Sequence, residues 1–143
     1  MTSAIAATTA DRQPIRRIRD IYEEKRGRGE PVISIELFPP KTLRAEEGLF
    51  ERALPRLATA EPDFFSVTYG AGGSTRDKTL EVVDRIQRQV GITGMAHLTC
   101  IGSTRDEVAR YLDDAKRLGI RNLLALRGDP PNGLPDVIPP DHG

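Results

Sequence analysis

The chain has 143 residues, its 21 basic side chains balance its 21 acidic ones, and 38% of its residues are hydrophobic. This neutral composition gives no attraction to nucleic acid or to a membrane surface, and no segment approaches the ~20 consecutive apolar residues of a spanning helix. The single cysteine, Cys100, has no partner for an internal disulfide. We therefore expect a cytoplasmic protein that binds neither nucleic acid nor membrane.

Residues 1–13 are small and polar and lack the pattern of a secretory signal, so they are expected to form a disordered tail. A mitochondrial presequence is the alternative, favoured by the clustered basic residues Arg12, Arg16, Arg17 and Arg19. Acidic residues among them argue against it. One domain is expected over residues 14–143.

The first half of this domain predicts two strands and two helices. A helix begins at Pro14, and its apolar face runs through Ile15, Ile18, Ile21 and Tyr22 until glycines at 27 and 29 end it. Alternating residues predict a strand at 33–38, which two prolines terminate. A second helical stripe covers residues 49–57, where Pro55 should cause a kink. The next strand is expected at 64–68.

The second half continues the same alternation of strands and helices. A helix with apolar residues from Leu80 to Val90 ends at Gly91, and a strand follows at 94–99. Thr104 and Glu107 have the spacing of a capping box and begin a helix that ends at Gly119. The last strand is expected at 122–127, and the proline-rich residues 128–143 predict a loop.

A repeated peptide reveals the unit of this architecture. Gly-Ser-Thr-Arg-Asp occurs at 73–77 and again at 102–106, each time between an apolar run and a helical stripe, about one βα unit apart. Such repeats predict a parallel α/β fold, and we expect a (β/α)8 TIM barrel of which this chain supplies about the first four βα units. Because a barrel needs about 250 residues, we expect a truncated chain; an open four-stranded sheet is the alternative.

Glu36 is the first candidate for chemistry. If the isoleucines of its strand face the helices, Glu36 points into the mouth of the barrel. A carboxyl group partly desolvated there beside Phe38 could hold a proton near neutral pH and act as a general acid. A structural ion pair with Lys41 or Arg127 accounts for the residue equally well.

The loop at 68–75 has three glycines between a strand and a helix, so its amides could approach the phosphate of a cofactor. An ordinary turn with Ser74 or Thr75 as helix cap explains the loop as well. Its spacing matches neither the dinucleotide fingerprint G-x-G-x-x-G nor the P-loop. The loop by itself thus leaves ligand binding and a plain turn as even alternatives.

His97 and the Arg127-Gly128-Asp129 peptide stand at the ends of the third and fourth strands. His97 has no set of metal ligands around it, so it is either a hydrogen-bond donor to a ligand or a satisfied histidine of the barrel wall. A charged pair around a glycine at a strand end is typical of ligand contact in barrels, with a salt-bridged turn as the alternative.

Four strand-end motifs together resemble one known family. The peptides are SIELFPPKT at 34–42, FSVTYGAGGSTRD at 65–77, HLTC at 97–100 and LALRGDP at 124–130. In order and placement they are similar to those of methylenetetrahydrofolate reductases, over about residues 31–131. The resemblance implies a flavin-containing barrel that passes a hydride from NADH or NADPH through FAD to 5,10-methylenetetrahydrofolate, giving 5-methyltetrahydrofolate for one-carbon metabolism and methionine supply.

The resemblance also implies roles for single residues. Glu36 corresponds to the general acid, and Asp129 to a catalytic carboxylate near flavin and folate. The positions that contact FAD correspond to Thr68, Tyr69, Ala71, His97, Arg127, Gly128 and Asp129. Thr68 would also meet the nicotinamide.

Length is the departure from this family, since later strands would supply further FAD and folate contacts. We therefore expect the 143-residue chain to lack reductase activity alone and the full-length enzyme to be a homo-oligomer. Two other interpretations compete. One is a flavin-free barrel such as an aldolase or a pterin-condensing transferase, and the other is a non-catalytic half-barrel interaction module.

Overall fold

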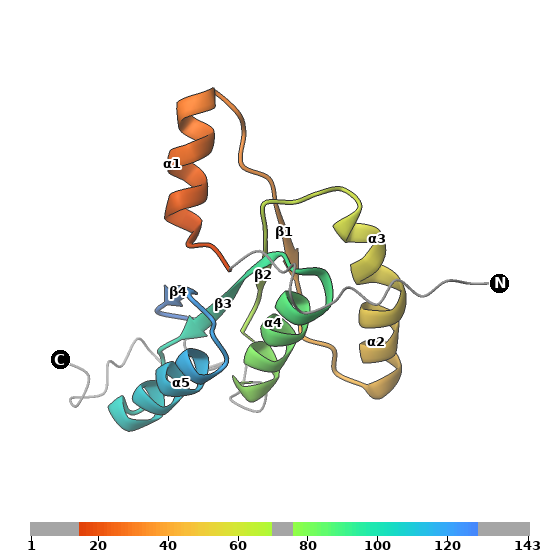
Figure 1. Cartoon of the computed structure of the whole chain (residues 1–143). Coiled ribbons are helices and arrows are strands. Elements are labelled where there is room, and N and C mark those ends of the chain that lie inside the picture. Colours follow the sequence, from red (N-terminus) through yellow and green to blue (C-terminus); the bar gives the residue numbers. More distant parts are fainter. Residues whose placement is uncertain (1–14, 70–75, 129–143) are drawn as a thin grey trace.

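The computed structural model describes residues 15–69 and 76–128, and the tail expected at 1–13 falls outside them. Within these ranges helices and strands alternate along the chain (Figure 1). The elements are α1 (Ile18–Arg28), β1 (Ser34–Leu37), α2 (Leu43–Glu47), the π-helical η2 (Gly48–Ala53), α3 (Leu54–Ala58), β2 (Phe64–Val67), α4 (Arg76–Val90), β3 (Thr93–Thr99), α5 (Arg105–Arg117) and β4 (Asn122–Leu126).

The four described strands form one sheet in the order β1-β2-β3-β4, and every neighbouring pair is parallel. Each strand pairs with the next strand of the chain, and helices connect them. Sequential order, parallel strands and connecting helices are the arrangement of one half of a (β/α)8 barrel. The predicted fold class is thus confirmed.

One face of the sheet packs against helices. Phe65 and Val67 of β2 and Ala96 and Leu98 of β3 alternate along their strands and join one buried core. Helix α4 contributes four buried aliphatic side chains to this core, Leu80, Val82, Val83 and Ile86. Helices α4 and α5 lie side by side along the sheet (Figure 1).

The opposite face, called the inner face below, carries the polar residues. Strand alternation and the register of the four strands place Glu36, Ser66 and His97 on it, together with Leu124 and Leu126 of β4. The two leucines are 37% and 38% exposed, whereas Ser66 and His97 are buried. Chemistry-bearing side chains therefore face away from the helical layer, as the alternation at 33–38 predicts.

Helix α1 begins later than the sequence predicts. Residues 15–17 are not helical, because their main chain bonds to the sheet instead. The Arg16 amide donates to Thr93 Oγ1 at 3.2 Å, and the Ile18 amide donates to Asn122 Oδ1 at 2.8 Å. Asn122 in turn donates to the Arg16 carbonyl. The start of α1 is thus fixed to the amino-terminal ends of β3 and β4.

An ion pair ties the end of α1 to the start of β2. Lys25 Nζ lies 2.8 Å from Asp63 Oδ2, which also accepts a hydrogen bond from the Ile33 amide. Although burial acts to raise the pKa of Asp63, the Ile33 amide and the Lys25 ammonium outweigh it and lower that pKa. Asp63 therefore stays charged and holds the chain where it enters β1.

The helix after β1 contains a π-helical segment immediately before its proline. It begins at Leu43, earlier than predicted, with the Thr42 hydroxyl accepting from the Ala45 amide. At the end of η2 the Leu54 amide donates to the Leu49 carbonyl, so the hydrogen bond spans one residue more than in an α-helix. Pro55 follows in the first turn of α3. Because Pro55 has no amide hydrogen to donate back along the helix, the regular hydrogen-bond pattern changes next to it, and the π segment lies immediately before it.

The remaining boundaries agree with the sequence within a residue or two at most ends. Thr104 accepts from the Glu107 amide while Glu107 Oε2 accepts from the Thr104 amide, so the predicted capping box is confirmed. Gly91 and Gly119 have φ near +70°, as residues that end helices do. Over the described residues, no helix has the length and apolarity needed to cross a membrane.

Candidate functional site

The described candidate residues gather at the carboxyl ends of the strands. Glu36 lies in β1, Thr68 directly follows β2, and His97 lies in the second half of β3. Arg127 and Gly128 directly follow β4. This edge is where parallel α/β barrels bind ligands, because the loops that follow the strands converge there.

Glu36 and His97 contact each other across the inner face. His97 Nε2 lies 3.7 Å from Glu36 Oε2, although β2 separates their strands. The side chain of His97 is 8% exposed, whereas that of Glu36 is 52% exposed. Among the described residues, Glu36 is thus paired with His97 rather than with Lys41 or Arg127, the partners considered from the sequence.

The exposure of Glu36 differs from the sequence-based expectation of a partly desolvated carboxyl group. Its neighbour Phe38 is 73% exposed and does not cover it. In the described part of the chain, the inner face beside Glu36 and Phe38 is accessible to solvent. The described residues therefore leave the Glu36 carboxyl group largely open to solvent.

His97 is the buried partner of this pair. Burial lowers the pKa of His97 below its ordinary value of 6.5, and the nearby Glu36 carboxylate only partly offsets this effect. Its Nε2 atom is buried and has no hydrogen-bond partner among the described residues. A buried nitrogen without a partner is costly, so the described residues leave one hydrogen bond of His97 unmet on the inner face.

Gly128 has a conformation and surroundings that exclude a side chain. Its φ is +87°, and a Cβ there would lie 2.2 Å from Thr99 Cγ2 and 2.7 Å from Ile101 Cγ2. The Ile101 amide donates to the Arg127 carbonyl at 2.8 Å, which fixes the chain after β3 against the chain after β4. Glycine is therefore required for two strand ends to approach this closely.

Three predicted features lie outside the described residues. These are Ala71, Asp129 and the glycine-rich part of the loop at 70–75. Their predicted roles stay predictions.

Two residues that the sequence did not single out contact the site from the helix side. Thr79 Oγ1 donates to the Thr68 carbonyl at 3.1 Å, and the Tyr111 hydroxyl donates to the His97 carbonyl at 3.0 Å. A hydroxyl on the buried face of an amphipathic helix is the sequence signal that could have identified them.

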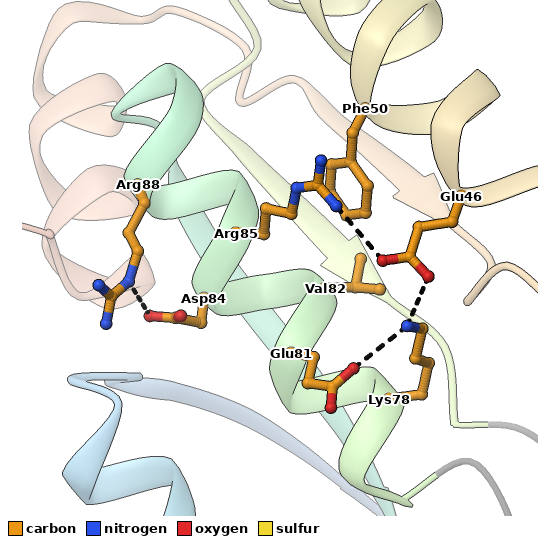
Figure 2. A pocket seen from close by; sticks show the side chains of 8 residues that line it. All are labelled: Glu46, Phe50, Lys78, Glu81, Val82, Asp84, Arg85 and Arg88. Carbon is orange, nitrogen blue, oxygen red and sulfur yellow. Dashed lines mark hydrogen bonds and ion pairs between the residues drawn. The ribbon is translucent and has the colours of Figure 1, made fainter. Parts of the chain in front are cut away.

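A cleft of about 240 Å³ lies elsewhere, between α2, η2 and α4 on the outer side of the helical layer (Figure 2). Lys78 Nζ lies 2.6 Å from Glu46 Oε2 and 3.2 Å from Glu81 Oε2, and hydrogen bonding to Glu46 raises the pKa of Lys78. Arg85 pairs with Glu46 and covers the ring of Phe50 at 3.9 Å. Both cations form ion pairs with neighbouring carboxylates. We therefore interpret the cleft as the place where an ion-pair network joins the helices.

Comparison with known proteins decides the family. The family model described as methylenetetrahydrofolate reductase matches residues 17–141, most of the chain. The chain belongs to the methylenetetrahydrofolate reductase family. The resemblance drawn from the four strand-end peptides is thus confirmed.

Individual relatives agree with this assignment. Methylenetetrahydrofolate reductase (NADH) 1 of Zea mays is 43% identical over 120 residues, covering 84% of this chain and 20% of the maize protein. The 5,10-methylenetetrahydrofolate reductases of Salmonella typhimurium and Escherichia coli are 41% and 39% identical over 115 residues, covering 79% of this chain and 38% of each relative. The chain thus spans well under half the length of these methylenetetrahydrofolate reductases.

Proposed function

We propose that residues 14–143 form the N-terminal half of a (β/α)8 barrel that reduces 5,10-methylenetetrahydrofolate to 5-methyltetrahydrofolate with NADH or NADPH. The observation that carries this proposal is the meeting of Glu36 and His97, with 3.7 Å between Oε2 and Nε2, at the ligand-binding edge of the sheet. Membership of the family supports it over a flavin-free barrel and over a non-catalytic half-barrel module.

FAD is the cofactor of the proposal, and when bound it supplies a carrier that takes a hydride from the nicotinamide and gives it to the folate. His97 Nε2 is buried and has no hydrogen-bond partner among the described residues, so it fits a polar group of such a ligand, and the side-chain-free surface of Gly128 fits its close approach. Thr68, Tyr69, Ala71, His97, Arg127, Gly128 and Asp129 would hold it. The maize relative is named for NADH, which supports NADH as one donor.

Glu36 is proposed as the general acid. It would protonate the folate nitrogen that leaves when the bridging methylene opens, so that the remaining nitrogen and the methylene carbon form a cationic iminium ready to accept the hydride. Asp129 would stabilise this cation by its negative charge in a poorly hydrated site. The half-exposed position of Glu36 leaves the carboxyl group open to a folate on the inner face, and the bound ligands would supply the partial burial that the role needs.

The proposal also includes a biological setting. The substrate would be a folate, the process one-carbon metabolism that supplies methionine, and the location the cytoplasm. Full-length enzyme is proposed to be a homo-oligomer, and the 143-residue chain alone is proposed to lack turnover because later strands contribute the remaining contacts.

Flavin titration tests this proposal. The chain is titrated with FAD while flavin fluorescence is followed, and steady oxidation of NADH is measured in parallel. We expect saturable FAD binding that His97→Ala weakens by about tenfold, from loss of a buried hydrogen bond, and that Tyr22→Phe on exposed α1 does not change. Absence of saturable binding contradicts the flavin site, and steady flavin-dependent NADH oxidation contradicts the proposed lack of turnover.

A further inference from the structure

Two main-chain carbonyls of the candidate site accept hydrogen bonds from side chains of the helices behind the sheet. Thr79 of α4 donates to the Thr68 carbonyl at 3.1 Å, and Tyr111 of α5 donates to the His97 carbonyl at 3.0 Å. Thr79 is fully buried and Tyr111 is 4% exposed. Each helix thus sends one buried hydroxyl group to the end of a neighbouring strand.

These carbonyls occupy equivalent places in the sheet. The β2–β3 pairing ends with Val67 opposite Ala96, and Thr68 and His97 are the next residues of their chains. The regular ladder between these strands therefore stops just before the two residues predicted to contact the cofactor. On its other side β3 stays paired with β4 through His97 to Thr99, so the helix hydroxyls supply hydrogen bonds where the β2–β3 ladder has ended.

Tyr111 also supports a second predicted contact residue. Its ring meets the ring of Tyr69 edge to face, with the ring centres 6.1 Å apart and an angle of 69° between the planes. One side chain of α5 thus touches both the main chain of His97 and the ring of Tyr69.

We infer that Thr79 and Tyr111 are positioning residues of the flavin site, an inference that rests on the proposed function. Neither needs to touch the cofactor. They fix the main chain of Thr68 and His97, and through His97 they fix the imidazole that lies 3.7 Å from Glu36. Because a contact misplaced by about 1 Å can cost much of its effect, loosening these carbonyls should weaken cofactor binding.

The competing explanation is purely structural, since buried hydroxyl groups generally find acceptors. A structural role predicts lower stability with an intact site. A positioning role predicts a changed site in protein that is still folded.

Variants that remove single hydroxyl groups separate these explanations. In Thr79→Val and Tyr111→Phe we expect the FAD dissociation constant to rise roughly three- to tenfold, the effect of one lost hydrogen bond. Thr79→Ser keeps the hydroxyl but loses a buried methyl group, so it should lower stability while retaining FAD affinity. Thr59→Val is the matched control, because the Thr59 hydroxyl also donates to a main-chain carbonyl, that of Arg56, on the exposed end of α3.

A readout without FAD keeps the inference separate from the proposed function. The imidazole of His97 is titrated by NMR in the FAD-free chain, where Glu36 is the charged group that faces it among the described residues. In Tyr111→Phe we expect the His97 titration to move upward toward 6.5, because a loosened strand end admits water.

Two results overturn the inference. One is folded Thr79→Val and Tyr111→Phe proteins with wild-type FAD affinity, and the other is a His97 titration unchanged in Tyr111→Phe. A wild-type chain that fails to bind FAD contradicts the proposed function, and the His97 titration alone then decides the positioning role.

Discussion

Helix α4, which carries Thr79, approaches β3 at a single glycine. A Cβ on Gly94 would lie 2.6 Å from Val83 Cγ1 and 3.4 Å from Gln87 Oε1. Val83 is fully buried in the core and cannot swing outward. Carbon atoms pack best at ~3.5–4.0 Å, so Gly94→Ala requires α4 to move away from the sheet by about 1 Å.

The cost of this change can be worked out from the contact. Overpacking a filled core costs about 1–3 kcal/mol, and we expect Gly94→Ala to lower the free energy of unfolding by about 2 kcal/mol. Val83→Ala should cost about 2–3 kcal/mol through lost burial and the cavity it leaves. In the double variant the methyl group that Gly94→Ala adds occupies that cavity, so the combined cost should fall short of the sum by at least about 1 kcal/mol.

Urea unfolding followed by circular dichroism measures all three free energies. Gly27→Ala is the control, since nothing lies within 4 Å of a Cβ there and α1 should gain about 0.5–1 kcal/mol. If Gly94→Ala has wild-type stability, or if the two changes are strictly additive in the double variant, then close approach at Gly94 does not set the position of α4.

Three further predictions concern charge and backbone. The free energy of unfolding should fall as the pH drops below about 6.5, because the unfolded chain binds a proton more readily than buried His97, and His97→Gln should flatten this slope. Asp63→Asn should lower the free energy of unfolding by about 1–3 kcal/mol at neutral pH. This difference should shrink as the pH falls below about 4, because protonation of Asp63 in the wild type removes the stability that its lowered pKa supplies. Gly128→Ala should cost about 1–3 kcal/mol because of its positive φ and its contact with Thr99.

Urea denaturation at a series of pH values checks the first two predictions, and a single neutral pH suffices for the third. The other histidine, His142, provides the control variant His142→Gln. An equal slope in wild type and His97→Gln contradicts the neutral buried imidazole. A pH-independent gap for Asp63→Asn, or a Gly128→Ala chain of unchanged stability, contradicts the other two.

Most of the fold could be predicted from the sequence because its signals are local. The period of two in residues 33–38 and the helical stripes of Leu80 to Val90 are set by which side chains must be buried. The capping box at Thr104 and the glycines after α4 and α5 depend on hydrogen bonds and backbone angles within a few residues. The order of the strands follows from the short, right-handed connections of repeated βα units.

The candidate site could be predicted only in part. Strand-end peptides indicated Glu36, His97 and Gly128 as separate positions, and their sequence was specific enough to identify the family. The partner of Glu36 was not predictable from local patterns, because Lys41, Arg127 and His97 can each pair with a carboxylate. The start of α1 was predicted too early for the same reason, since distant side chains of the sheet take up its first hydrogen bonds.

The periodic elements, their parallel order and the family could thus be read from the amino-acid sequence, because each depends on neighbouring residues or on the whole set of peptides. Folding in three dimensions sets the contact of Glu36 with His97, the half exposure of Glu36, and the hydrogen bonds from the Thr79 and Tyr111 hydroxyls to the strand ends. These contacts join residues from different elements. Their distances depend on how closely the helices pack on the sheet, and a glycine such as Gly94 sets that spacing.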